Sequence, residues 1–405
     1  MKIKTMRLID HWVGRPICFV LTVVNKLIGI FVTPKAPAKF NSILFIKLAE
    51  QGATVLADSA IRKAIEMVGK ENVYFLVFKQ NRFILDVMNL IPAKNVLTID
   101  EKNIFSLFFG TISSILSIRR MRIDAAINFE FFARFSAILT YLSGAKVRVG
   151  FHTFADESPY VGDLMTHRMS YNPHLHTSQT FETMVDALTL PAEEMPRMNI
   201  EAPELKAIES KFVPEQQELS EFKTLFEKEA QTNNFSPLIL INANASDMLP
   251  LRRWPTERYE ELAKRLIEKF PSLHIAFTGS SEETEKAMQI VNAVNSQRCF
   301  SMTGKTTLKQ LMLLYCLADV LITNDSGPAH FAALTDIQVI TLFGPETPKL
   351  FGAIGERSHI LWKNIPCSPC VSAYNNRNSV CEDNVCMQRI SVDEVFDLVC
   401  QLCPQ

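Results

Sequence analysis

The feature that most constrains the fold of this chain is a repeated alternation of short apolar runs with longer amphipathic stretches. In the first half, apolar runs occur at 43–46, 72–78, 95–100, 125–130 and 146–151. Such runs are typical of parallel strands that are buried on both faces, and the amphipathic stretches between them supply crossover helices. This half therefore predicts a parallel sheet covered by helices on both sides.

The same alternation starts again near residue 237. Strands are predicted within 237–246, 274–279, 319–325 and 338–344, and helices within 256–270, 282–294, 307–318 and 327–335. A length of 405 residues suits two domains. We expect an α/β protein with two Rossmann-like domains whose parallel sheets face a central cleft, because open sheets bind ligands at the carboxyl ends of their strands.

A polar stretch rich in Glu and Lys separates the two halves and sets the expected domain boundaries. The division is an N-terminal segment at 1–40, a first domain at 41–205, a connecting segment at 206–235 and a second domain at 236–405.

Composition narrows the class of protein. Hydrophobic residues make up 47% and charged residues 21%, which is usual for a globular protein with a core. The net charge of −1 creates no overall field that would attract nucleic acid. Nine cysteines are too few for a disulfide scaffold and no cleavable secretion signal is evident, so we expect the cytoplasm.

The N-terminal segment is apolar from residue 17 to 32, apart from Asn25 and Lys26. A lysine inside such a segment makes crossing a bilayer costly. The segment is preceded by Trp12 and by four cations, Lys2, Lys4, Arg7 and Arg15. This pattern predicts a helix lying in the membrane interface with its cations on anionic lipid. The alternatives are a spanning helix and an ordinary helix packed on the protein's own surface.

The stretch TNDSGPAHFAA, residues 323–333, follows a predicted strand and opens a predicted helix. The N–H groups and positive end of that helix favour a phosphate, and Gly327 lets a ligand approach the backbone. His330, about one turn inside the helix, can point back to the same ligand. The alternative is that Asp325 or Ser326 only caps the helix and that His330 is a surface histidine.

Two other loops leave the same predicted sheet edge. Arg252 and Arg253 stand just before a helix, where paired guanidinium groups suit a diphosphate, although two solvated arginines are the plainer alternative. Glu282 and Glu283 follow the next strand. They can accept hydrogen bonds from ribose hydroxyls or can merely complement the dipole of their helix.

Four cysteines near the C-terminus have the spacing C-x2-C-x10-C-x4-C; they are Cys367, Cys370, Cys381 and Cys386. Four thiolates in a loop-rich segment suit a tetrahedral structural zinc site. The alternative is four reduced thiols in a tail that packs across the domains.

Taken together, these segments resemble glycosyltransferase family nine, the bacterial heptosyltransferases, which have the GT-B fold. TNDSGPAHFAA followed by VITLFGPETP resembles the donor-site signature of that family. RRWP, ILFIKLAEQGATVLADSAIRKA and INFEFFARFSAILTYLSGAKVRVGF resemble its other segments. The resemblance covers about residues 42 to 395 in the family's motif order.

The resemblance implies inverting transfer of heptose or a similar sugar, without a cofactor or catalytic metal. The implied donor is a nucleotide diphosphate sugar, ADP-heptose foremost. The implied acceptor is a lipopolysaccharide core or other lipid-linked glycan of the bacterial cell envelope. Such an enzyme would work in the cytoplasm, peripheral to the inner face of the cytoplasmic membrane.

For the donor site in the second domain, the resemblance implies that Asp325 binds sugar hydroxyls and that Ser326 and Gly327 bind the diphosphate, with His330 alongside. Arg252 stands where the family often has a basic phosphate ligand. We add four neighbouring residues to this predicted donor set: Ser246, Arg253, Glu282 and Glu283.

One departure concerns the acceptor loop of the first domain. The family usually has Gly-Asp there, and that Asp is its proposed base, whereas this chain has Gly52 and Ala53. We predict that Glu50 replaces it, with Gln51, Gly52 and Glu130 forming the acceptor loop. Two alternatives stay open: a nucleotide-sugar epimerase, which can share this fold, and a non-catalytic glycan-binding or scaffold protein, which the missing aspartate suggests.

Overall fold

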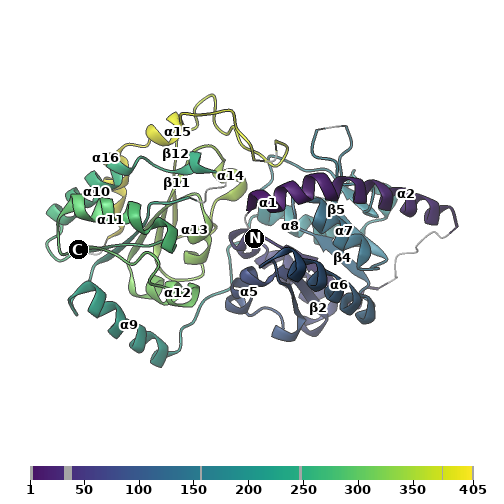
Figure 1. Cartoon of the computed structure of the whole chain (residues 1–405), viewed down its shortest axis with the longest axis horizontal. Helices are drawn as coiled ribbons and strands as arrows, with labels where there is room; N and C mark the ends of the chain where they lie inside the picture. The colour runs from purple at the N-terminus through teal and green to yellow at the C-terminus, as the bar shows by residue number, and fades with distance from the viewer. Residues whose placement is uncertain (1–2, 32–38, 156, 246–248, 376, 404–405) are drawn as a thin grey trace. The chain divides into compact units, whose positions relative to one another are not determined.

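The computed structural model describes residues 3–31, 39–155, 157–245, 249–375 and 377–403, which form two compact units (Figure 1). Unit 1 comprises Met1–Ser210 and Ala373–Arg377, and unit 2 comprises Lys211–Ser372 and Asn378–Gln405. The predicted connecting segment is divided between them, because helix α9 (Gln216–Ala230) buries part of its surface in unit 2.

The sheet of unit 1 has six parallel strands in the order β3-β2-β1-β4-β5-β6. The strands are β1 (Ile43–Ile46), β2 (Val73–Phe78), β3 (Val96–Ile99), β4 (Ala125–Asn128), β5 (Val147–Phe151) and β6 (His167–Met169). Strand order reverses between β1 and β4, so the loops that leave these two strands lie side by side at the carboxyl edge of the sheet.

The helices of unit 1 cover both faces of this sheet. They are α1 (Ile3–Ile9), a π-helical turn (Asp10–Gly14), α2 (Arg15–Phe31), α3 (Gln51–Val55), α4 (Asp58–Val68), α5 (Arg82–Met88), α6 (Ile104–Met121), α7 (Arg134–Leu142) and α8 (Thr177–Asp186). Helices α6 and α7 pack on one face, where Ile118 and Leu139 join the cluster that contains Leu44. Helix α2 lies over α7 as an outer layer, and Met6 of α1 contacts the same cluster (Figure 1).

Unit 2 repeats this architecture with the strand order β12-β11-β10-β7-β8-β9, again parallel throughout. Its strands are β7 (Leu238–Asn242), β8 (His274–Phe277), β9 (Cys299–Ser301), β10 (Val320–Asn324), β11 (Gln338–Phe343) and β12 (Ser358–Trp362). Its helices after α9 are α10 (Thr256–Lys269), α11 (Thr284–Val294), α12 (Leu308–Leu317), α13 (Gly327–Ala332), α14 (Pro348–Phe351), α15 (Val385–Gln388) and α16 (Val392–Leu402). The prediction of two Rossmann-like α/β domains is confirmed.

The N-terminal helix is attached to unit 1 through small and polar side chains. A Cβ atom added to Gly14 would lie 2.9 Å from the Cβ of Arg134, so only glycine allows this close packing on α7. Asp10 accepts the main-chain N–H of Phe135 at 2.8 Å and pairs with Arg134 at 3.2 Å. These contacts fix the start of the helix, including its π-helical turn.

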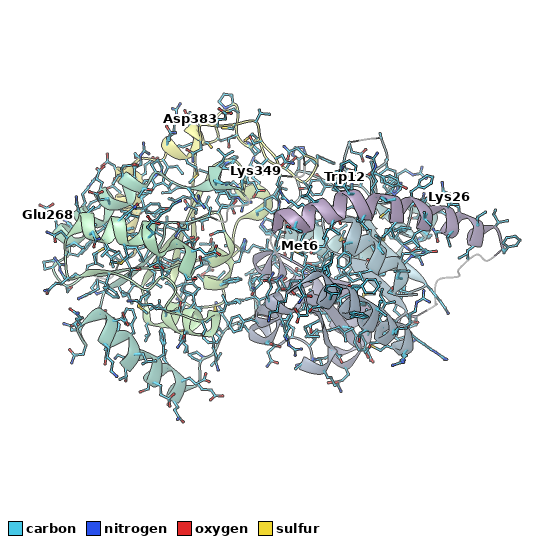
Figure 2. The ribbon with its side chains drawn as sticks, in the orientation of Figure 1. Met6, Trp12, Lys26, Glu268, Lys349 and Asp383 are labelled. Carbon is cyan, nitrogen blue, oxygen red and sulfur yellow. The ribbon has the colours of Figure 1, made fainter. Side chains whose placement is uncertain are left out.

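Further along, Thr22 accepts the N–H of Asp163 at 2.8 Å and Asn25 donates to the carbonyl of Asp163 at 3.0 Å. The polar side of the helix therefore packs against the protein, and most of its apolar side chains are exposed. Figure 2 shows Met6 and Trp12 on opposite sides of this helix. The exposed apolar residues are Leu8, Trp12, Val13, Ile17, Phe19, Val20, Val23, Val24, Leu27, Ile28, Ile30 and Phe31.

This orientation is the reverse of that expected for a helix of a soluble protein, which turns its apolar face to the core. The alternative of a helix packed on the protein's surface is thus correct about the packing but does not account for the outward apolar face. Lys2 and residue 32 of the predicted segment lie outside the described residues.

Candidate functional site

The candidate site of unit 2 is built on a buried ion cluster at the end of β10. Asp325 directly follows the strand, and its N–H donates to the carbonyl of Leu342 on β11 at 3.0 Å. Its carboxylate lies 3.4 Å from the Nε of Arg252, and the Nη1 of the same guanidinium donates to the Asp325 carbonyl at 3.2 Å. The same guanidinium pairs with the buried carboxylate of Glu346. Arg252 therefore compensates two carboxylates that would be costly to bury alone.

A hydrogen-bond network around Asn324 holds Arg252 in this place. The Asn324 side chain accepts from the N–H of Trp254 at 3.1 Å and from the hydroxyl of Tyr259 at 3.0 Å, and it donates to the carbonyl of Asn244 at 3.2 Å. The buried indole of Trp254 donates to the carbonyl of Ile390 at 2.9 Å. The RRWP segment is thus fixed to the end of β10, next to the predicted donor-binding aspartate.

The turn after β10 does not behave as a simple helix cap. Ser326 is the N-cap residue of α13, but its hydroxyl donates back to the carbonyl of Asn324 at 3.0 Å and makes no bond to the first turn. His330 is buried, so the alternative of a surface histidine is wrong. A Cβ atom added to Gly327 would meet only the ring of Phe331, at an ordinary contact distance of 3.4 Å. Packing within the protein therefore does not require glycine at this position, and close approach of a ligand remains a prediction.

The remaining donor-binding candidates have structural contacts of their own. Arg253 donates to the carbonyl of Ala245 at 2.9 Å and so holds the loop after β7. The Glu283 carboxylate accepts the main-chain N–H of Ser280 at 2.7 Å, at the start of the short helical turn Ser281–Glu283. This contact agrees with the alternative that the acid stabilises the beginning of its own helix. Glu282 is exposed. Ser246 lies outside the described residues. The donor contacts of all four residues remain predictions.

In unit 1, the neighbouring loops after β1 and β4 carry a second charged cluster. Lys47 is fully buried, and its Nζ lies 2.9 Å from Glu130 and 3.3 Å from Glu50. The other carboxylate oxygen of Glu130 accepts the N–H groups of Leu48 at 2.7 Å and Ala49 at 3.0 Å. Glu130, one of the residues predicted for the acceptor loop, thereby fixes the backbone just before Glu50.

Glu50 itself has an unusual backbone conformation. Its φ of 64° and ψ of 74° lie in the left-handed region, which costs a non-glycine residue about 1–2 kcal/mol and occurs preferentially at functional sites. Its side chain also pairs with Arg377, from the segment 373–377 that returns to unit 1. Arg7 lies within electrostatic range of both, and burial together with Arg377 lowers the pKa of Arg7. Arg7 was expected among the lipid-facing cations, but it is partly buried and belongs to this cluster.

The other carboxylate near the loop is excluded as a base by its contacts. Asp58 is buried, pairs with Arg62 at 2.9 Å and accepts the N–H of Ser210 at 3.3 Å, which ties the end of unit 1 to α4. Gln51 begins α3 and donates to a main-chain carbonyl of the neighbouring loop at 3.2 Å, and Gly52 is buried in the same helix. Glu50, in contrast, is only partly buried, and its role as the base remains a prediction.

Within the described part of the chain, none of these four cysteines forms a disulfide bond. Burial raises the pKa of Cys386 to about 11, and Cys367, Cys370 and Cys381 all lie within its electrostatic range. Among the residues that the structure describes, no three side chains of His, Cys, Asp or Glu converge closely enough to hold a metal ion. Thiolates are suitable ligands for zinc, but these four sulfur atoms do not lie close enough together in this structure to bind one ion.

Three charged residues of the two clusters are absent from the sequence-based predictions. Lys47 had a usable signal, because it directly follows the apolar run of β1 at a ligand-binding edge. Glu346 lies within the quoted segment VITLFGPETP, where an acid follows a buried strand. Arg377 had no signal, since 327 positions separate it from its partner Glu50 in the sequence.

Comparisons with known proteins agree with this geometry. Residues 113–380 match the family model described as glycosyltransferase family 9 (heptosyltransferase). The chain is 32% identical over 115 residues to lipopolysaccharide heptosyltransferase 2 of Salmonella typhimurium, an alignment that covers 28% of this chain and 32% of that protein. The chain therefore spans about a third of the length of this curated relative.

Solved structures show the same fold over most of the chain. The ADP-heptose lipopolysaccharide heptosyltransferase II of Escherichia coli has a TM-score of 0.66 at 19% identity, covering 89% of this chain and 98% of that one. The E. coli heptosyltransferase WaaC with ADP has a TM-score of 0.60 at 14% identity, covering 89% of this chain and 100% of that one. Both are GT-B proteins, and the family model matches most of the present chain. The chain belongs to glycosyltransferase family 9, the heptosyltransferase family.

Proposed function

We propose that this protein transfers a heptose or similar sugar from a nucleotide diphosphate sugar to an acceptor of the lipopolysaccharide core type. The observation that carries the proposal is the buried cluster of Asp325, Arg252 and Glu346 at the strand ends of unit 2, within the family-matched residues. Solved neighbours contain ADP and ADP-2-deoxy-2-fluoro heptose, which supports ADP-heptose as the donor.

In the proposed reaction, unit 2 binds the donor. The Asp325 carboxylate accepts hydrogen bonds from sugar hydroxyls, while Gly327 leaves room for the diphosphate at the start of α13. As the bond between the anomeric carbon and the diphosphate breaks, negative charge grows on the leaving group. Arg252 and the main-chain N–H groups of this turn supply fixed positive potential for that charge.

Unit 1 would bind the acceptor and activate its hydroxyl. Glu50 removes the hydroxyl proton as the acceptor oxygen attacks the anomeric carbon from the face opposite the leaving group, which inverts the configuration. Lys47 and Arg377 hold the Glu50 carboxylate between two cations. This arrangement would replace the aspartate that the family usually has and that this chain lacks at Ala53.

The direct test is to incubate the purified protein with labelled ADP-heptose and a lipopolysaccharide-core acceptor. The proposal expects labelled acceptor and free ADP in equal amounts. Label recovered only as an isomeric nucleotide sugar would indicate an epimerase. Binding of ADP-heptose with no release of ADP would indicate a non-catalytic glycan-binding protein.

We also propose that the enzyme works bound peripherally to the inner face of the cytoplasmic membrane. Two described helices are long and apolar enough to cross a membrane, Thr5–Phe31 and Ile104–Met121. The second is α6, whose two ends lead into β3 and β4 of one sheet, so it can meet a bilayer only along its side. The first is tied along its length to unit 1, which also favours lying on the membrane.

The outward face of α6 resembles that of α2. Its exposed apolar residues recur at helical spacing and form one stripe: Phe105, Phe108, Phe109, Ile112 and Leu116. Three arginines gather at the C-terminal end of the helix, at 119, 120 and 122. Since α1 and α6 contact the same core cluster, both apolar surfaces cover the same face of the sheet. An apolar face flanked by cations is typical of binding to an anionic membrane surface.

Replacing Phe105, Phe108 and Phe109 by serine should weaken binding to anionic vesicles by at least about tenfold, because each phenylalanine contributes roughly 2 kcal/mol when fully buried. Vesicle co-sedimentation measures the effect. Leu225→Ser, at an exposed apolar position on α9 of unit 2, is the matched control and should bind like the wild type. Unchanged binding of the triple variant would refute a role for α6, and membrane extraction only by detergent would favour a spanning N-terminal helix.

For the four cysteines, we propose a structural zinc ion, whose binding would bring the four thiols closer together than they lie in this structure. Their positions bracket in sequence the segment 373–377 that carries Arg377 to unit 1. Protein purified without chelators should contain about one zinc per chain and should melt at a lower temperature after chelation. Substituting Cys367 and Cys370 by serine should remove the metal. Metal-free protein with four titratable thiols at these positions would contradict the proposal.

A further inference from the structure

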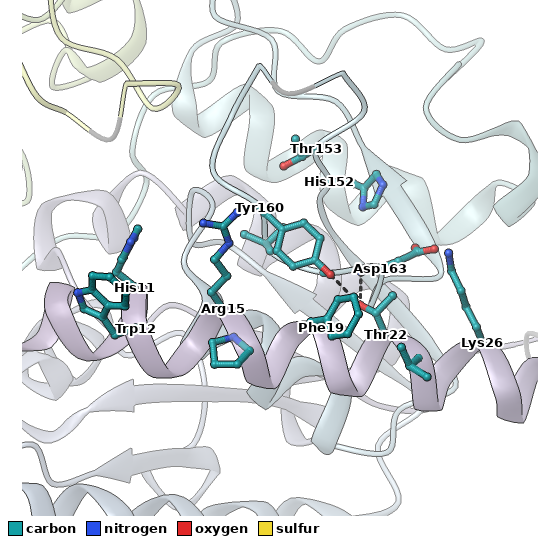
Figure 3. Close-up of a pocket in the computed structure, with 14 residues that line it drawn as sticks. His11, Trp12, Arg15, Phe19, Thr22, Lys26, His152, Thr153, Tyr160 and Asp163 are labelled. Carbon is teal, nitrogen blue, oxygen red and sulfur yellow. Dashed lines mark hydrogen bonds between the residues drawn. The ribbon is translucent and has the colours of Figure 1, made fainter.

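A pocket with a volume of about 920 Å³ lies between the N-terminal helix and the loop that follows β5 (Figure 3). One wall consists of residues spaced along α2 and the turn before it, among them Arg15, Phe19 and Lys26. The other wall includes His152 and Tyr160. The size is within the range of pockets that hold small molecules or headgroups, and the whole pocket belongs to unit 1.

The pocket has positive charge at both ends of its helical wall. Arg15 and Lys26 are exposed and rise from the helix into the pocket (Figure 3), and neither forms an ion pair with another described residue. The acid in the wall, Asp163, already pairs with Arg168 at 3.4 Å. Eleven residues at a rise of about 1.5 Å place the two cations roughly 16 Å apart along the axis.

Between these cations, the two walls carry aromatic side chains, Phe19 on the helix and Tyr160 opposite. The Tyr160 hydroxyl lies 3.5 Å from that of Thr22, which holds the loop against the helix. Sugar rings have apolar faces that pack on aromatic side chains, and phosphates at the two ends of such a sugar would meet Arg15 and Lys26. A single phosphate would fill only one end of this pocket.

We propose that this pocket binds the phosphorylated saccharide headgroup of the acceptor lipid. The proposal rests on the proposed function, because it assigns the acceptor of that reaction. Outward apolar residues of the same helix that do not line the pocket, such as Val20, Val24 and Leu27, would lie among the acyl chains, so that the pocket opens where the headgroup of a membrane lipid is found. The helical wall of the pocket precedes the family-matched residues 113–380, whereas the opposite wall, with His152 and Tyr160, lies within them.

The same helix connects the pocket with the charged cluster of unit 1. Arg7, which lies within electrostatic range of Glu50 and Arg377, precedes Arg15 by eight positions, or roughly 12 Å of helix. The pocket and the surroundings of the predicted base are therefore connected by one continuous helical segment. We infer that this connection gives the N-terminal helix a role in positioning the acceptor.

The test compares the full-length wild type with the double variant Arg15→Gln/Lys26→Gln. Binding is measured on two kinds of phosphatidylcholine vesicle with matched surface charge. One contains lipid A, which is an acylated diglucosamine with two phosphates, and the other contains phosphatidylglycerol. The wild type should prefer lipid A. The double variant should bind lipid A vesicles about tenfold more weakly and lose that preference, with a smaller change on phosphatidylglycerol.

The matched control is Arg120→Gln/Arg122→Gln, which removes two exposed cations outside the pocket, at the end of α6. It should weaken binding to both kinds of vesicle equally and preserve the preference for lipid A. A wild type without that preference, or a pocket variant that behaves like the control or the wild type, would overturn the proposal. This test measures binding to vesicles and not transfer of heptose. A failure of heptosyl transfer would therefore refute the proposed function without deciding whether the pocket binds lipid A.

Discussion

Asp325→Ala is expected to reduce kcat/KM for sugar transfer by at least about a hundredfold, the scale seen when a single charge-stabilising group is removed from an active site. The carboxylate stands at the end of β10, beside Arg252 and at the start of α13, where donor sugar and diphosphate are proposed to lie. Transfer of label from ADP-heptose to acceptor measures the effect, and isothermal titration with ADP-heptose measures the accompanying loss of donor affinity.

The fold should survive this substitution, because Glu346 still pairs with Arg252 and no isolated charge remains buried. Thermal unfolding checks this point. Asp336→Ala, at an exposed position in the same unit, is the matched control and should retain activity. Near wild-type turnover in Asp325→Ala would show that the donor is bound elsewhere.

Glu50→Gln is expected to lower kcat by at least roughly tenfold, because Gln keeps the shape of the side chain but cannot accept the acceptor proton. A positioned base typically contributes about a hundred- to ten-thousandfold. Donor affinity should change little, because the donor is proposed to bind to unit 2. Lys47 remains paired with Glu130 in this variant, so its buried charge stays compensated. The acidic limb of the pH profile of kcat, which reports ionisation of the base, should disappear.

Glu71→Gln is the matched control, an exposed glutamate of unit 1 that pairs with Lys94 on the surface. Its kcat and pH profile should equal those of the wild type. If Glu50→Gln keeps a normal kcat, Glu130 becomes the next candidate for the base, and its substitution would have to be separated from damage to the loop that it holds at Leu48 and Ala49.

The sequence by itself determined the interior of both sheets. The strands β1, β4, β7 and β10 are buried on both faces, so they are apolar except for the last one or two residues of β4, β7 and β10, and they stand out from the helices around them. The strands that escaped prediction are β6, β9 and β12, all at sheet edges and with some residues less buried. An edge strand needs fewer apolar residues, and its pairing depends on a neighbour distant in the chain.

The donor site follows the same logic. Asp325, Ser326, Gly327 and His330 are contiguous, so a local pattern of strand, turn and helix was sufficient to predict them as a group. The pairing of Arg252 with both Asp325 and Glu346 was not predictable in this way, because it depends on the network that joins Trp254 to Asn324.

Only the tertiary structure decided the surroundings of Glu50 and the orientation of the N-terminal helix. Arg377 reaches Glu50 through a segment that returns from the far end of the chain, and no local pattern encodes such a contact. An apolar helix can turn either side to the protein. Here Gly14, Thr22 and Asn25 find packing and hydrogen-bond partners on unit 1, and those contacts direct the apolar side outward.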